Sequence, residues 1–145
     1  MKYTILKTAS LALILSSSLL IAPISMVAAA EAAQQTVIPT TIDGIWQAID
    51  ARSAELKATI AAAKLDQVHH QAFAIRDLVA ALPARSTSLP ADKLANVRVA
   101  VKFVATLAER LDATGDAKDL AGTKQNCTKL VGVLASLRSN YTLAK

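Results

Sequence analysis

The sequence contains a single cysteine, and this shortage limits how the protein can be held together. Cys127 has no partner within the chain, so no intramolecular disulfide can form and the fold depends on packing alone. The residue lies in the middle of an apolar stripe near the C-terminus, where a thiol behaves as a small buried hydrophobic group. The alternative, a disulfide between two chains, requires that thiol to be exposed.

Aromatic residues and excess charge are also scarce, which argues against nucleic-acid binding. After the first thirty residues the aromatic side chains are Trp46, Phe73, Phe103 and Tyr141. They are too few to form a platform on which bases stack. The formal net charge of +5 falls to +3 when Lys2 and Lys7 are left out. Such a mild excess does not predict nucleic acid as the partner.

Motifs of common enzyme sites are absent as well. The sequence contains no G-x-S-x-G, G-x-x-x-x-G-K-[ST], H-E-x-x-H or C-x-x-C-H. A nucleophile–base pair of Cys127 and His69 would require a buried thiol to meet a histidine on the flank of another helix. We therefore expect a protein that binds rather than catalyses.

The first thirty residues have the three-part pattern of a secretory signal peptide. Two lysines give a positive start, an apolar run of 11 residues follows, and three alanines precede Glu31 as a cleavage site. A transmembrane anchor is the alternative, but three serines and Pro23 interrupt a run that falls short of the ~20 apolar residues needed for spanning. The sequence thus predicts export to the bacterial periplasm or the medium.

Removal of residues 1–30 leaves 115 of the 145 residues, a length that suits one domain. Residues 31–41 hold a proline and no sustained apolar period, so we expect a flexible N-terminal segment. In residues 42–141 apolar side chains recur three and four positions apart, which indicates amphipathic helices. The expected helices are, approximately, 42–63, 65–82, 90–114 and 117–141.

Turn and cap residues separate these helices. Thr40, Thr41 or Asp43 can cap the first helix, and Ser88 before Pro90 can cap the third. No segment shows the alternation of a strand. Because the turns after the first and third helices are short, the pattern predicts an all-α fold, an up-down-up-down four-helix bundle.

The two halves of the bundle share a faint repeat. A shift of 55 residues aligns Leu56 with Leu111, Leu65 with Leu120, Ile75 with Leu130, Val79 with Leu134 and Leu82 with Leu137. Duplication of one helical hairpin explains this alignment. Two unrelated hairpins with leucine and alanine stripes would also align in this way.

Both histidines lie in the second expected helix, which makes it the one candidate for metal chemistry. At 100° per residue, His69 lies on a flank and His70 nearly opposite the core, with Asp66 between them one turn earlier. Imidazole and carboxylate ligands suit copper, nickel or zinc. A solvated histidine pair is the alternative, because adjacent residues on a helix point about 100° apart.

Three apolar side chains are candidates for an interaction surface. Phe73 lies off the main stripe of the second helix, where either a neighbouring helix or a partner covers it. Phe103 and Leu107 widen the apolar face of the third helix to about half its circumference, more than a bundle helix needs. This width favours self-association or an unknown protein partner.

From Leu120 onward the charged residues are all basic: Lys124, Lys129, Arg138 and Lys145. A basic face of this kind can touch anionic lipid, which gives membrane-surface contact as a further alternative. A solvated face is the simpler interpretation.

The expected arrangement is similar to that of the small periplasmic haem bundles, cytochrome b562 and cytochrome c′. The b562 type uses a methionine near the start of the first helix and a histidine on the last, but here the only methionines are Met1 and Met26 and the last helix has no histidine. The C-x-x-C-H that the c′ type needs is absent. Haem is therefore not expected as a cofactor.

The segment Val68–Pro83, VHHQAFAIRDLVAALP, also resembles uncharacterised exported bacterial proteins, some from metal-efflux contexts. The resemblance implies metal handling as the alternative to a protein-interaction role. It assigns no site residue beyond the histidine pair.

Overall fold

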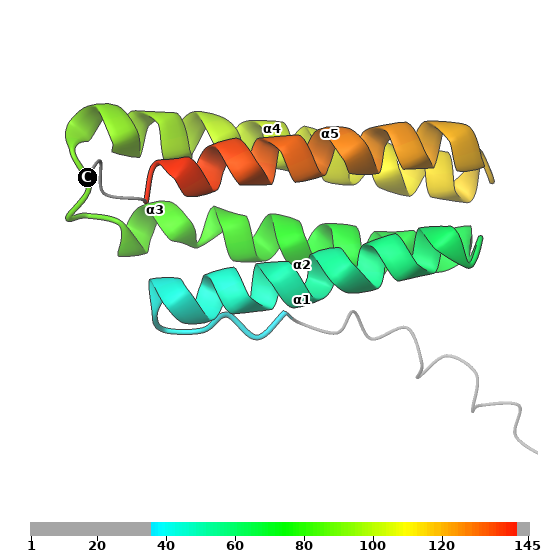
Figure 1. Ribbon diagram of the computed structural model, residues 1–145, viewed down its shortest axis with the longest axis horizontal. Helices are drawn as coiled ribbons and strands as arrows, with labels where there is room; N and C mark the ends of the chain where they lie inside the picture. Colours follow the sequence, from blue (N-terminus) through cyan, green and yellow to red (C-terminus); the bar gives the residue numbers. More distant parts are fainter. Residues whose placement is uncertain (1–35, 142–145) are drawn as a thin grey trace, which may run out of the picture. The chain divides into compact units, whose positions relative to one another are not determined.

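The computed structural model describes residues 36–141 as an all-helical domain with four long helices (Figure 1). Their bounds are α1 Ile42–Ala61, α2 Val68–Ala80, α4 Ala91–Asp116 and α5 Leu120–Ser139. Two short elements complete this part of the chain, a 3-10 turn η1 at Leu65–Gln67 and the one-turn helix α3 at Leu82–Arg85. The expected signal peptide and residues 31–35 of the expected flexible segment lie outside the described residues.

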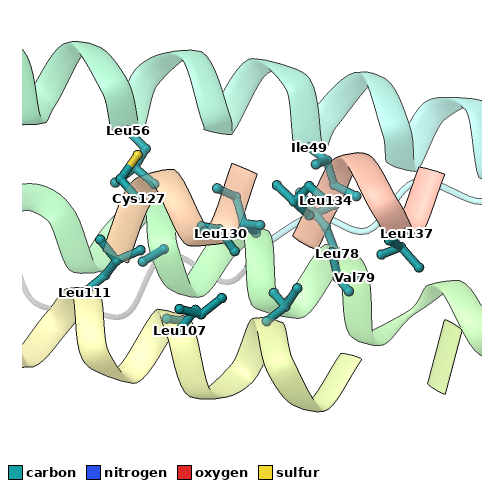
Figure 2. Packing of buried hydrophobic residues seen from close by; sticks show 14 of the residues in the cluster. Ile49, Leu56, Leu78, Val79, Leu107, Leu111, Cys127, Leu130, Leu134 and Leu137 are labelled. Atoms are coloured by element: carbon teal, nitrogen blue, oxygen red, sulfur yellow. The ribbon is translucent and has the colours of Figure 1, made fainter. Parts of the chain in front are cut away.

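The four long helices lie side by side and enclose one core. α1 packs on α2, α2 on α4, α4 on α5 and α5 on α1. Aliphatic side chains from all four helices meet between them (Figure 2). The largest fully buried side chains are Ile45, Ile49, Leu56, Ile75, Leu78, Leu82, Leu111, Leu130, Leu137, Val68, Val79 and Val97. None of the helices within residues 36–141 is long and apolar enough to cross a membrane.

The start of α1 is capped as the sequence predicts. The hydroxyl of Thr41 accepts a hydrogen bond from the amide of Gly44 at 3.1 Å. α4 begins differently, because Pro90 is its cap and makes no side-chain hydrogen bond. Ser88 is exposed and does not cap α4, so that prediction was wrong.

The segment after α2, between the second and third expected helices, contains α3 and a buried serine. Pro83 lies in the first turn of α3, where its missing amide is not needed. Ser86 is fully buried; its hydroxyl donates to the carbonyl of Leu82 at 2.7 Å and lies 2.8 Å from the hydroxyl of Tyr141. This bond ties the segment between α2 and α4 to the end of α5.

Two turns have the same hydrogen-bond pattern at positions 55 residues apart. After α1, the amide of Lys64 donates to the carbonyl of Thr59, and after α4 the amide of Asp119 donates to that of Thr114. The residue before each donor has a left-handed backbone, with φ of 54° at Ala63 and 56° at Lys118. These are Schellman endings on non-glycine residues. The repeat seen in the sequence therefore extends to backbone conformation.

Gly115 is buried within the last turn of α4. A Cβ at this position would lie 2.7 Å from the carbonyl oxygen of Leu65. Glycine is needed here because α4 lies directly against the η1 backbone.

Candidate functional site

An exposed row of side chains runs along α4, and we call it the α4 stripe. Its members recur every three or four residues: Asp92, Asn96, Val99, Phe103, Thr106 and Arg110. All six are exposed, including the two large apolar ones, since Val99 is 52% and Phe103 59% exposed. Large apolar groups at such exposure cost solvation free energy unless a partner covers them.

A groove of about 560 Å³ lies beside the apolar part of the stripe, between α4 and α5, and we call it the α4–α5 groove. It is lined by Asn96, Val99, Ala100, Phe103, Val133, Ser136, Leu137, Ser139 and Asn140. The lining is uncharged and mixes apolar side chains with hydroxyl and amide groups. Such a concave surface suits an apolar side chain with a polar surround.

Leu107 does not belong to this surface, although the sequence placed it there. It is only 6% exposed and points into the core, where Figure 2 shows it near Leu130 and Leu111. The prediction was wrong because α4 packs against both α2 and α5, which together cover more of its circumference than one neighbour would. Phe103, one turn earlier on α4, is not covered by these two helices.

Phe73 is partly covered by its own chain. It packs against the core and carries the guanidinium of Arg76 over its ring, with 4.6 Å from Cζ to the ring centroid. Arg76 is held in turn by the carboxylate of Asp77 at 2.9 Å. Phe73 does not line the α4–α5 groove.

The structure brings the two histidines of α2 close together. The ring centroids of His69 and His70 are 3.9 Å apart, with 44° between the ring planes. His69 is half-buried, and His70 and Asp66 are exposed. Within residues 36–141 no group of three or more His, Cys, Asp or Glu side chains has the spacing of a metal site. Asp66, on η1, thus does not complete a triad with the two imidazoles.

The basic side of α5 is less free than its sequence suggests. Arg138 bonds the carboxylate of Asp50 at 2.7 Å, and its guanidinium lies 4.4 Å from the ring centroid of Trp46. Trp46 also meets the ring of Tyr141 edge-on, at 5.6 Å between centroids. This cluster joins the start of α1 to the end of α5, a contact that sequence spacing does not reveal. Arg138 is therefore largely a structural residue.

Cys127 is buried at 7% exposure, as expected for a core thiol. Figure 2 shows it beside Leu56 of α1. Burial raises the pKa of the Cys127 thiol, and the nearby ammonium of Lys57 partly opposes that rise. The thiol is thus poorly placed for nucleophilic chemistry or for a disulfide between chains.

Comparisons with protein-family models, with curated proteins and with solved structures give no match to this chain. The candidate site therefore consists of the exposed α4 stripe and the adjoining groove, described from their own geometry.

Proposed function

We propose that this chain is an exported helical bundle that binds a protein partner through the α4 stripe and the α4–α5 groove. The observation that carries the proposal is the exposure of Val99 and Phe103 beside an uncharged hollow. Aromatic side chains beside a pocket are the usual anchors of protein interfaces. The only other large apolar side chain exposed within residues 36–141 is Val37, outside the helices.

Several features support a non-catalytic role outside the cytoplasm. The N-terminal thirty residues have the composition of a signal peptide, and a bundle without disulfides relies on its packed core. The buried thiol and the lack of catalytic motifs both favour binding over catalysis. We infer further that the helices run up-down-up-down, which agrees with the short turns after α1 and α4 and with the Trp46–Tyr141 contact.

Site-specific photocross-linking tests the binding surface. We expect a cross-linked product when Phe103 of the full-length chain is replaced by p-benzoylphenylalanine and the cells that produce the protein are irradiated. The same residue at exposed Ala51 of α1 is the matched control and should give none. No product at position 103, or equal products at both positions, would contradict the proposal.

Transition-metal binding by His69 and His70 is a second candidate function. The observation that favours it is the 3.9 Å separation of the two ring centroids, since two imidazoles are suitable ligands for copper, zinc or nickel. Calorimetric titration of Cu(II) or Zn(II) into tag-free protein is expected to show binding that His69→Ala/His70→Ala abolishes. Binding weaker than millimolar, or unchanged in the double variant, would exclude this function.

A further inference from the structure

The α4 stripe has the spacing of a coiled-coil seam. Its six positions are separated alternately by four and three residues, which is the a/d pattern of a heptad repeat. A seam of this kind is complementary to another helix. All six side chains are exposed, so no other part of residues 36–141 occupies that place.

The stripe is complementary to itself when two copies of α4 lie antiparallel with a two-fold axis at Val101. In that register Asp92 meets Arg110 of the partner copy, and Asn96 meets Thr106. Val99 meets Phe103. Every pair then joins opposite charges, two polar groups or two apolar groups. A parallel arrangement would instead place Asp92 on Asp92 and Arg110 on Arg110, which is repulsive.

The α4–α5 groove fits the same register. In antiparallel packing, the partner's side chain that lies opposite Val99 enters a hole formed by four residues of α4. These are Val99 itself and the residues three positions before, one position after and four positions after Val99. Those positions are Asn96, Val99, Ala100 and Phe103, which are the α4 residues that line the groove. The phenyl group of the partner's Phe103 would enter there, with α5 as the second wall.

From the charge pairing and the position of the groove, we infer that the occupant of the α4 stripe is a second copy of this chain, bound antiparallel through α4. This inference rests on the proposed function and names its partner. Lys102 of both copies lies on one flank of the axis, where the long side chains can diverge into water. With one apolar pair on each side of the axis, the dimer belongs to the small, reversible class of interfaces.

Sedimentation velocity of the protein expressed as the full chain and purified from the exporting host tests the dimer. We expect the sedimentation coefficient to rise toward that of a dimer between about 5 and 500 µM, the range for weak association. Phe103→Ser should remain a monomer throughout. A wild-type protein that stays monomeric at the highest concentration would overturn the inference.

Charge exchange tests the register. Asp92→Arg and Arg110→Asp should each abolish the dimer, because each places like charges at both ends of the seam. An equimolar mixture of the two variants should restore it, since every end then joins opposite charges. The matched control Arg98→Asp changes an exposed residue of α4 outside the stripe and should leave the dimer intact. Single variants that dimerise as the wild type does, or a mixture that stays monomeric, would overturn the register.

The outcomes separate the two proposals. A monomer in sedimentation together with a Phe103 cross-link to a different protein overturns the second copy as partner and leaves the binding surface standing. A monomer with no cross-linked product at position 103 overturns both. A cross-linked product of twice the chain mass, with the charge-exchange result, supports both.

Discussion

At the residue scale, Gly115 lets α4 approach the η1 backbone more closely than any larger residue allows. We expect Gly115→Ala to lower the free energy of unfolding by about 1–2 kcal/mol, because the added methyl would lie 2.7 Å from the Leu65 carbonyl oxygen. Gly132→Ala is the matched control in α5, where no atom lies within 4 Å of an added Cβ. It should raise stability by about 0.5–1 kcal/mol through helix propensity. Urea unfolding measures both, and equal effects would contradict the close approach at Gly115.

Cys127 illustrates how burial controls chemistry at a single residue. Because burial raises the pKa of its thiol, less thiolate is present in the folded protein than in a free peptide at the same pH. We expect iodoacetamide to alkylate the folded protein at pH 8 at least about tenfold more slowly than the urea-unfolded chain. Equal rates in the two states would show that the thiol is accessible.

The raised pKa of the Cys127 thiol also determines how the free energy of unfolding changes with pH. The unfolded chain loses its thiol proton above about pH 8.5, whereas the folded chain holds it to higher pH. The contribution of the Cys127 thiol to the free energy of unfolding is therefore fully present below about pH 8.5 and is lost as the pH rises further. Burial also raises the pKa of the Tyr141 hydroxyl, so the loss of folding stability continues at more alkaline pH.

At the scale of elements, the two Schellman turns each hold a non-glycine residue in the left-handed region. That conformation costs an ordinary residue roughly 1 kcal/mol. We expect Ala63→Gly and Lys118→Gly each to raise the unfolding midpoint in urea, with a gain of about 0.5–1 kcal/mol. Ala62→Gly, one position earlier with φ of −80°, is the control and should bring no gain. A lower free energy of unfolding in both turn variants would contradict the claim that Ala63 and Lys118 are strained.

The order and type of the long helices could be predicted because they follow from local chemistry. Apolar residues spaced three and four apart predict helices, and Thr41 before such a stripe predicts a cap. α3 was missed because Pro83 and the polar residues after it have the composition of a loop. Ser86, which follows α3, is bonded to Tyr141, a residue 55 positions away that local sequence does not reveal.

The candidate site could be predicted only in part. Phe103 and Leu107 were both predicted to lie on an interaction surface. Phe103 is exposed, but Leu107 is buried, because periodicity gives the width of an apolar face and not how many neighbouring helices cover it. The α4–α5 groove depends on the spacing between two helices, which no single helix reveals. His69 and His70 were correctly predicted to lie on the second long helix. The position of Asp66 could not be predicted, because it depends on how α1 joins α2 through η1.

At the scale of the whole molecule, two apolar residues one turn apart on α4 differ in their surroundings. Leu107 is buried in the core, and Phe103 is exposed and is proposed to contact a partner. In urea unfolding at low protein concentration, where chains do not associate, Leu107→Ala should cost about 2–5 kcal/mol because it opens a cavity. Phe103→Ala should cost less than about 1 kcal/mol, as for an exposed residue. A loss at Phe103 as large as that at Leu107 would place Phe103 in the core and contradict the binding surface.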